Sequence, residues 1–460
     1  MRSTFVGGLL VRTLHPTQLV VLSFAGAILA GAFLLMTPWA STGVRTSFVD
    51  ALFTATSATC VTGLAVVDTG THFTPFGQWV VLALIQLGGL GIMTYSSVFL
   101  LVMGGRLSFK SQFILEDTLG RKARTSAQKL VRDVFVYTFA IEVAGAALLT
   151  LVFARSHGLG YALYSGVFHS VSAFCNAGFS LYPKNLEAYR GDWIVNFTVM
   201  GLIVVGGLGF TVLEDLYDAW VDWRMGRPLR LRLHSKIVLA TTIVLIVVGA
   251  IGVWVCEHRN VLSGLDWDES LLACLFQSIT PRTAGFNTLN YAVMTNTTLF
   301  LTILLMFIGA SPGSCAGGIK TSTFAVVGAL FKDRLMARQR VSIFRRTLPD
   351  DTVSRAVAIL IASFVFVTVM TVGLLATEVG PTPYREGGGS FLGLFFETVS
   401  AFGTVGLSAG VTPSLSAPGK LLITFVMFVG RVGPLTLAMA VGRKAERGKF
   451  RFAEENVMVG

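Results

Sequence analysis

Long apolar segments alternate with short polar loops along the whole chain. Eight of these segments approach about 20 residues, the length of a helix that crosses a bilayer. They lie near 18–37, 76–103, 134–154, 194–216, 236–256, 296–331, 355–376 and 420–441. Between the two segments of each successive pair lies a shorter amphipathic stretch that is too short to cross. The pattern predicts an all-α membrane protein with eight transmembrane helices and four re-entrant pore helices.

Each amphipathic stretch ends in a glycine turn, and the four turns are divergent copies of one motif. They read SATCVTGL at 57–64, SAFCNAGF at 172–179, ITPRTAGF at 279–286 and SAFGTVGL at 400–407. A second glycine cluster follows each turn, at 87–94, 205–212, 308–318 and 429–436. This repetition predicts four membrane–pore–membrane repeats in one chain around a pseudo-fourfold pore. Their expected bounds are 1–104, 105–222, 223–331 and 332–460.

The recurring glycines suit a ring of backbone carbonyls around a cation. A dehydrated alkali ion needs oxygen ligands, and a backbone that turns successive carbonyls inward needs the positive φ values that glycine tolerates. Each pore helix also points its carbonyl end at the turn, which favours a cation. Alternatively, the glycines only allow tight packing, but four of them at one position disfavour that interpretation. The predicted filter comprises Val61, Thr62, Gly63, Asn176, Ala177, Gly178, Thr283, Ala284, Gly285, Thr404, Val405 and Gly406.

The chain has 460 residues, of which 53% are hydrophobic and only 13% charged, too few charges for the surface of a soluble protein of this size. The net charge is +11, and most basic residues lie near the N-terminus and in 106–132, 224–236, 332–355 and 443–451. These regions alternate with the basic-poor loops that carry the glycine turns. The positive-inside rule therefore predicts a multi-pass protein of the cell membrane with both termini in the cytoplasm.

The charge pattern also bears on other partners. The basic residues flank apolar segments and form no stripe with interleaved aromatic residues, so we expect contact with membrane lipid and none with nucleic acid. Five cysteines and six histidines show no spacing typical of metal ligands. The LGGLG run at 87–91 matches a dinucleotide fingerprint only superficially, since no strand precedes it. No organic cofactor is therefore expected.

Five motifs and one lone arginine extend the picture beyond the turns. They are TATSATCVTGLAVVDTGTHFT at 54–74, IQLGGLGIMT at 85–94, PRTAGFNT at 281–288, GSCAGGIKTST at 313–323, SAFGTVGLS at 400–408, and Arg431. Together they closely resemble the membrane subunits of the Ktr/Trk/HKT superfamily of potassium transporters, and the Ktr type above all. The resemblance implies sodium-stimulated potassium uptake, with K+ as the transported ion and Na+ as a second ion. It also implies one filter per protomer, a homodimer, and a cytosolic KtrA-like regulatory ring that binds ATP or ADP.

Two features favour the Ktr type over the Trk type. The first apolar segment begins near residue 18, which leaves no room for the additional N-terminal helix pair of Trk proteins. All four filter positions hold glycine, whereas a serine in the first repeat marks the sodium-preferring plant relatives. Asn176 and Arg282 nevertheless make the filter chemically uneven. The alternative within transport is a proton-coupled Trk-type potassium symporter.

Ionisable residues at membrane depth are costly, and we treat each as a functional hypothesis. Arg431 is interpreted as an electrostatic barrier below the filter, or as a structural guanidinium bonded to the carbonyls of broken helices. Arg282 is expected to point away from the pore and hold the filter from behind, against Glu397. Asp68 lies just outside the first turn, where it either enriches cations or caps the loop.

The sixth apolar segment is interrupted by the run from Gly309 to Gly318, which holds four glycines and a proline. A helix does not persist through such a run, and unwound backbone at this depth must be buried in protein or line a water-filled cavity. We interpret the run as a mobile gate beneath the filter, with a static kink as the alternative. The predicted gate residues are Gly309, Ser311, Pro312, Gly313, Ser314, Gly317, Gly318, Lys320 and Arg431.

The loops at 104–133 and 332–355 mix charge with apolar residues, which suits docking to a cytosolic protein. Regulation by a nucleotide would then come from that partner. The rival from another class is an intramembrane enzyme that uses Cys60, Cys175 and His169. No motif pairs a base with a nucleophile, however, so we expect no enzymatic activity.

Overall fold

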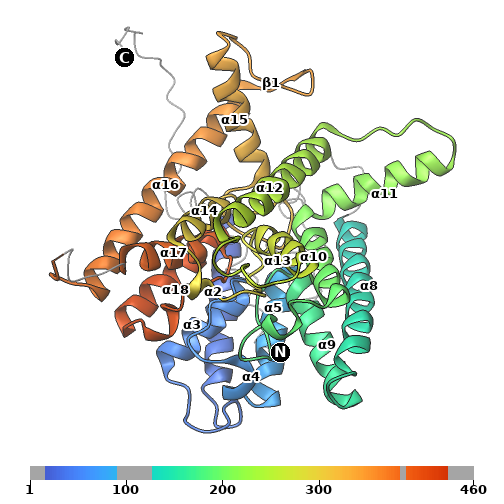
Figure 1. Ribbon diagram of the computed structural model, residues 1–460. Coiled ribbons are helices and arrows are strands. Elements are labelled where there is room, and N and C mark those ends of the chain that lie inside the picture. Colours follow the sequence, from blue (N-terminus) through green and yellow to red (C-terminus); the bar gives the residue numbers. More distant parts are fainter. Residues whose placement is uncertain (1–15, 91–126, 384–389, 434–460) are drawn as a thin grey trace, which may run out of the picture.

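The computed structural model describes residues 16–90, 127–383 and 390–433, and these residues are helical almost throughout (Figure 1). Four helices precede the glycine turns, and each packs against the long helix before it. These pairs are α2 (Pro16–Leu35) with α3 (Phe48–Thr59), α8 (Ala127–Phe153) with α9 (Leu159–Phe174), α12 (Leu233–Glu257) with α13 (Trp267–Ile279), and α16 (Asp350–Glu378) with α17 (Ser390–Gly403). We call α3, α9, α13 and α17 the pore helices.

A second helix follows each turn and packs against the pore helix of the next unit. These second helices are α5 (Pro75–Gly89), α10 (Trp193–Leu208), α14 (Asn296–Phe307) and α18 (Ala417–Val432). Helix α5 contacts α9, α10 contacts α13, α14 contacts α17, and α18 contacts α3. An ion pair of 2.7 Å between Lys420 of α18 and Asp50 of α3 joins the last unit to the first. The helix contacts therefore close in a ring.

The second glycine clusters let the second helices approach the ends of the pore helices. A Cβ atom on Gly88 would collide with the carbonyl oxygen of Thr59, and one on Gly430 with that of Phe402. The same holds in the second unit for Gly206 and Phe174. Because no side chain fits there, these glycines set the distance between each second helix and the pore helix of its own unit.

Fewer helices than expected are long enough to cross a membrane unaided. Within the described ranges, three helices are long and apolar enough to cross a membrane: Arg132–Phe153, Leu233–Glu257 and Asp350–Glu378. The segment expected to span the membrane at 194–216 is not one straight helix, because α10 and α11 (Phe210–Arg224) meet at a bend of 99°. Gly209, with φ of 86°, makes that bend. The second helices end at their glycine clusters, and the parts of the expected spans at 91–103 and 434–441 lie outside the described residues.

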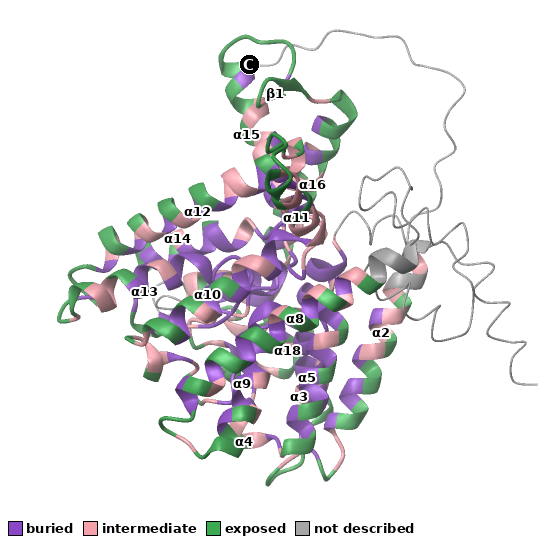
Figure 2. Ribbon diagram, turned by 90° about the vertical axis from the view of Figure 1, so that its right-hand side faces the viewer, coloured by how far each residue is buried: buried purple, intermediate pink, exposed green. Residues whose placement is uncertain are grey.

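The remaining elements lie at opposite ends of the bundle. Helix α15 (Thr321–Leu335) and the hairpin of β1 (Ser342–Ile343) and β2 (Arg346–Thr347) project from one end, and α4 (Thr69–His72) lies at the other (Figures 1 and 2). Three short 3-10 helices, η1 (Glu187–Tyr189), η2 (Tyr291–Val293) and η3 (Thr412–Ser414), follow the later turns.

Buried residues gather around the pore helices, whereas the long helices expose their outer faces (Figure 2). Those faces are apolar: Val143, Ile251 and Phe364 are all more than half exposed, at 67%, 57% and 65%. Apolar surface of this extent would be a liability in water and is suited to contact with lipid.

Candidate cation filter and gate

The pore helices end in one recurrent turn. In the first unit, the Thr62 amide donates to the Ser57 carbonyl at 2.7 Å and the Val61 amide to that of Ala58 at 3.1 Å. The corresponding bonds join Ala177 to Ser172 at 2.7 Å and Val405 to Ser400 at 2.8 Å. This is a Schellman-type cap, in which a left-handed residue ends the helix and satisfies its last carbonyls. The third unit closes more tightly, since its Ala284 amide bonds to Thr280 at 3.0 Å.

In three units, the residue that adopts the left-handed backbone conformation in this cap is of a type that rarely does so. Val61, Thr283 and Thr404 have φ of 57°, 70° and 50°, and all three are β-branched. Only Asn176, with φ of 60°, tolerates this conformation readily. A residue in such a region costs about 1–3 kcal/mol, and it persists where the surroundings determine the backbone. Two residues further on, each turn has its expected glycine at positive φ: 94° at Gly63, 70° at Gly178, 75° at Gly285 and 88° at Gly406.

The four glycines meet one another in a closed ring. A Cβ atom on Gly178 would lie 2.8 Å from the Cα atom of Gly285, and one on Gly285 would lie 2.5 Å from the carbonyl oxygen of Val405. Likewise, Cβ atoms on Gly63 and Gly406 would collide with the carbonyls of Ala177 and Thr62, respectively. Each turn thus presents its backbone to the next, and backbone carbonyls from all four converge where no side chain fits.

Hydroxyl groups hold the turns from behind, and the sequence interpretation missed them. Ser57 Oγ accepts from the Gly63 amide at 3.1 Å and donates to the Leu64 carbonyl at 2.7 Å. Ser172 Oγ donates to the Phe179 carbonyl at 2.8 Å, and Ser400 Oγ accepts from the Gly406 amide at 3.1 Å. The sequence signal for these hydroxyl groups was the serine at the first position of three of the four motifs. The third motif has Ile279 there, and the neighbouring Thr280 bonds to the Phe286 carbonyl instead.

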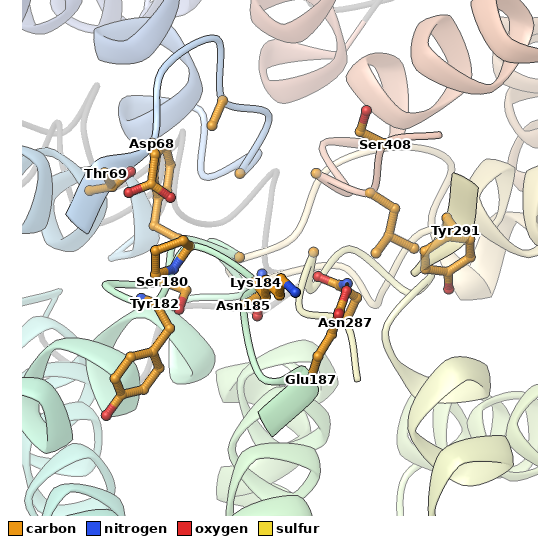
Figure 3. Close-up of a pocket in the computed structure, with 18 of the residues that line it drawn as sticks. Asp68, Thr69, Ser180, Tyr182, Lys184, Asn185, Glu187, Asn287, Tyr291 and Ser408 are labelled. Carbon is orange, nitrogen blue, oxygen red and sulfur yellow. Dashed lines mark hydrogen bonds between the residues drawn. The ribbon is translucent and has the colours of Figure 1, made fainter. Parts of the chain in front are cut away.

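A cavity of about 410 Å³ opens beyond the ring, on the side toward which the chain leaves each turn. All four filter glycines line it, and its charged residues are Asp68, Lys184 and Glu187 (Figure 3). Of the two interpretations of Asp68, the structure supports the cap, and enrichment of cations stays a prediction. Its Oδ1 caps α4 by accepting from the amide and the hydroxyl of Thr71, both at 2.8 Å, and its side chain lies at the cavity wall.

The expected contact between Arg282 and Glu397 is absent, and that prediction is wrong. Both Glu397 oxygens bind the loop after the fourth turn: Oε1 accepts from Ser408 at 2.6 Å and from the Ala409 amide at 3.1 Å, and Oε2 accepts from Thr412 at 2.5 Å. Arg282 is buried, as expected for a residue behind the filter, and its Nε has no hydrogen-bond partner. The Glu397 carboxylate therefore stabilises the loop after the fourth turn, because the hydroxyls and the amide of that loop donate hydrogen bonds to it.

With the exception of Arg431, the predicted gate residues lie in a folded loop between α14 and α15 that spans 308–320. Ile308 and Ile319 pair at its base, and a Cβ atom on Gly309 would collide with the Gly317 carbonyl. Within the loop, Ser314 Oγ donates to the Ser311 carbonyl at 2.7 Å, and Lys320 Nζ to that of Ala316 at 2.6 Å. Lys320 therefore anchors the segment. We call residues 308–320 the gate loop.

The gate loop touches two other units. The Ser311 amide donates to the Gly207 carbonyl at 3.1 Å, and a Cβ atom on Gly209 would lie 2.7 Å from the Pro312 carbonyl oxygen. On the other side, the Gly317 amide donates to Thr404 Oγ1 of the fourth turn at 3.0 Å. Gly313 and Gly318 have φ of 76° and 66°, so the loop path depends on them. The loop thus lies against the filter, opposite the cavity.

Arg431 reaches the same loop. It is 6% exposed, and its Nη1 and Nη2 donate to the carbonyls of Cys315 and Gly88. These contacts correspond to the structural interpretation of this arginine, in which the guanidinium satisfies carbonyls at helix breaks. An electrostatic barrier at this position stays a prediction.

Of the groups proposed for the rival chemistry, His169 has structural hydrogen bonds. His169 bonds to the Ser165 carbonyl at 2.8 Å and to Ser180 Oγ at 2.9 Å, which ties the second pore helix to the loop after its turn. Cys60 and Cys175 are buried free thiols. In the described parts of the chain, no group of three histidine, cysteine or acidic residues is placed to hold a metal ion.

Comparison with known proteins places this arrangement. The TrkH family model, described as "Cation transport protein", matches residues 9–451. The chain is 40% identical over 447 residues to "Ktr system potassium uptake protein B" of Bacillus subtilis, covering 97% of each protein. It is 36% identical over 454 residues to "Potassium/sodium uptake protein NtpJ" of Enterococcus hirae, covering 98% of each. The solved structure of the potassium transporter TrkH from Vibrio parahaemolyticus is similar in fold, with a TM-score of 0.71 at 18% identity, over 93% of this chain and 84% of that one.

The fold and these similarities define a helical membrane transporter of cations. The chain belongs to the TrkH family of cation transport proteins, within the Ktr/Trk superfamily that its motifs indicated. The relatives are named as cation transporters, a class of protein that is not enzymatic.

Proposed function

We propose that this chain takes up potassium across the cell membrane through the ring of glycine turns. The observation that carries the proposal is the mutual contact of the four turns, in which each filter glycine abuts the backbone of the next. A ring that admits no side chain offers a passing ion backbone carbonyls as its ligands. The names of the relatives, which refer to potassium uptake, support K+ as that ion.

The surroundings of the ring suit this role. A K+ ion that sheds its water needs ligands that keep their positions, and the hydroxyl groups of Ser57, Ser172, Thr280 and Ser400 brace the turns. The pore helices add the negative ends of their dipoles on the same side. The filter then comprises the twelve residues of the four turns named above, with Na+ as a second ion that stimulates uptake.

The architecture proposed with this function is four membrane–pore–membrane repeats with the bounds given above. Eight helices enter the membrane, and the second helix of each repeat ends part-way through it, at its glycine cluster. Both termini lie in the cytoplasm, so the cavity faces outward and the gate loop faces inward. The closed ring of helix contacts supports this arrangement.

Regulation is proposed to come from a cytosolic KtrA-like ring that binds ATP or ADP, with the membrane protein as a homodimer. The "Ktr system" in the name of the Bacillus subtilis relative supports a further subunit. The segment 332–355, with its exposed arginines around β1 and β2, is one docking surface. The other predicted surface, at 104–133, lies largely outside the described residues. The gate loop is the element on which this partner acts.

Potassium-limited growth of an uptake-deficient host tests the proposal. The chain should restore growth and rubidium uptake, more strongly with a co-expressed regulatory subunit and with added sodium. Uptake that needs no sodium but collapses with a protonophore, at a membrane potential clamped by other means, would favour the Trk-type proton-coupled symporter. Failure to move K+ or Rb+ in a correctly inserted form would reject potassium transport.

A further inference from the structure

The cavity next to the glycine ring contains a positive charge, although such a charge repels the cations that the proposed filter conducts. Lys184 lines this cavity together with all four filter glycines. In Figure 3 it lies in the middle of the view, with Asp68 on one side and Asn287 and Glu187 on the other. A cation that enters this cavity therefore shares it with an ammonium group.

The backbone that carries Lys184 is held on both sides. The Asn185 amide donates to the Tyr182 carbonyl at 2.9 Å, and the Glu187 amide to the Lys184 carbonyl at 3.2 Å. Between them, the fully buried Leu186 donates its amide to the Asn287 carbonyl of the next unit at 3.1 Å. The side chain of Lys184 is exposed, but its attachment point is fixed relative to two of the four turns.

The charge is not neutralised by a neighbour. Among the described residues, no ion pair within 4.0 Å includes Lys184. Asp68 is engaged by Thr71, and Glu187 Oε1 accepts from Asn287 Nδ2 at 3.2 Å. The cavity lining therefore holds two carboxylates and one free ammonium. Lys184 lies six residues after the filter glycine of the second unit. At the same distance from their filter glycines, the other units carry the uncharged Thr69, Tyr291 and Thr412, so only the second unit has a charge at this position.

We propose that Lys184 sets the apparent affinity of the transporter for external K+. This inference rests on the proposed function. A fixed positive charge in a cavity with low-dielectric walls lowers the local concentration of cations at the filter. Among the described residues, no hydrogen bond joins the Lys184 side chain to a filter carbonyl, so Lys184 affects the entry of cations and does not coordinate the dehydrated ion. It therefore raises the KM for K+ without changing the maximal rate or the K+/Na+ ratio.

The test uses the full chain with its regulatory subunit in the uptake-deficient host, with initial rubidium or potassium uptake at low and high ionic strength. At about 10 mM salt, Lys184→Gln should lower KM by about two- to fivefold, and Lys184→Glu should lower it further. Lys184→Arg should behave as wild type. In about 0.3 M choline chloride the difference should largely vanish, because salt screens exposed charges. Arg259→Gln is the matched control, since Arg259 is an exposed cation in the loop after α12 that does not line the cavity.

A second measurement varies the charge at one position. The Lys184→Cys variant should return toward the wild-type KM with a positively charged methanethiosulfonate and move to a still lower KM with a negatively charged one. Equal KM values for wild type, Lys184→Gln and Lys184→Glu at low salt would overturn the inference. So would a change confined to maximal rate or selectivity, which would show a structural role. Absence of uptake by the wild-type chain would instead overturn the proposed function.

Discussion

Arg431, at the end of α18, donates a hydrogen bond to the carbonyl oxygen of Cys315 in the middle of the gate loop. Its other terminal nitrogen donates to Gly88, at the end of α5. One guanidinium thus joins the fourth unit, the first unit and the gate loop. Because both acceptors are carbonyls at helix breaks, the planar fork of arginine suits the position better than the point charge of lysine.

The first prediction concerns this link. Arg431→Ala should raise potassium flux by about tenfold, because hydrogen bonds to a charged group are worth about 1.5–3 kcal/mol each and their loss frees the gate loop. The removal of a positive charge below the filter acts in the same direction. The measurement is rubidium uptake normalised to the amount of inserted protein.

Arg431→Lys separates the two causes. Lysine keeps the charge but cannot bridge both carbonyls, so a tether predicts raised flux and a pure barrier predicts flux near wild type. Reduced flux together with reduced thermal stability in both variants would show that the arginine only holds the fold together.

Much of this arrangement was predictable from the chain. The four turns were found because glycine at positive φ has few substitutes, and the gate break because glycines and a proline between Gly309 and Gly318 cannot remain helical. The bend at Gly209 was missed, since a single glycine within an apolar segment is also compatible with a continuous helix. The partners of Arg431 and Glu397 were not predictable either. The carbonyls that Arg431 reaches belong to other units, 116 and 343 residues away, and the Glu397 partners depend on how the loop after the fourth turn folds back onto its pore helix.

A second prediction tests the glycine ring. Gly178→Ser should lower the K+/Na+ permeability ratio by about tenfold or more, because a Cβ atom there would lie 2.8 Å from Gly285 Cα and φ is 70°. Gly406→Ser should do the same by colliding with the Thr62 carbonyl. Gly201→Ser is the control, because Gly201 lies on α10 with open space around it. Unchanged permeability ratios in both filter variants would reject the filter assignment.

The third prediction concerns the hydroxyl braces. Ser57→Ala removes two hydrogen bonds to the first turn and should lower the free energy of unfolding by about 1–2 kcal/mol, with a smaller loss of K+/Na+ discrimination. Ser363→Ala is the matched control, since Ser363 is also buried but its hydroxyl has no partner. Thermal unfolding in detergent and sodium competition of rubidium uptake provide the two readouts. Equal effects of the two substitutions would argue against a brace.

The last prediction concerns the gate loop itself. Deleting residues 311–316 removes the Ser311 bond to Gly207 and the Cys315 bonds to Gly206 and Arg431. Since a hydrogen bond between neutral groups contributes about 1 kcal/mol and one to a charged group about 1.5–3 kcal/mol, flux should rise about tenfold or more and should depend less on the regulatory subunit. The K+/Na+ ratio should change little, because the filter glycines are not touched.

Thr404→Val provides the same test without shortening the chain. Valine keeps a β-branched side chain at this position of the fourth turn. The substitution removes only the 3.0 Å hydrogen bond that the Gly317 amide donates to Thr404 Oγ1. Thr283→Val is its matched control, at the same place in the third turn, where the hydroxyl has no bond to the gate loop. A raised flux in Thr404→Val but not in Thr283→Val would show that the loop is held against the filter. Wild-type flux and wild-type nucleotide response in a correctly inserted deletion variant would leave the break between α14 and α15 as a static kink.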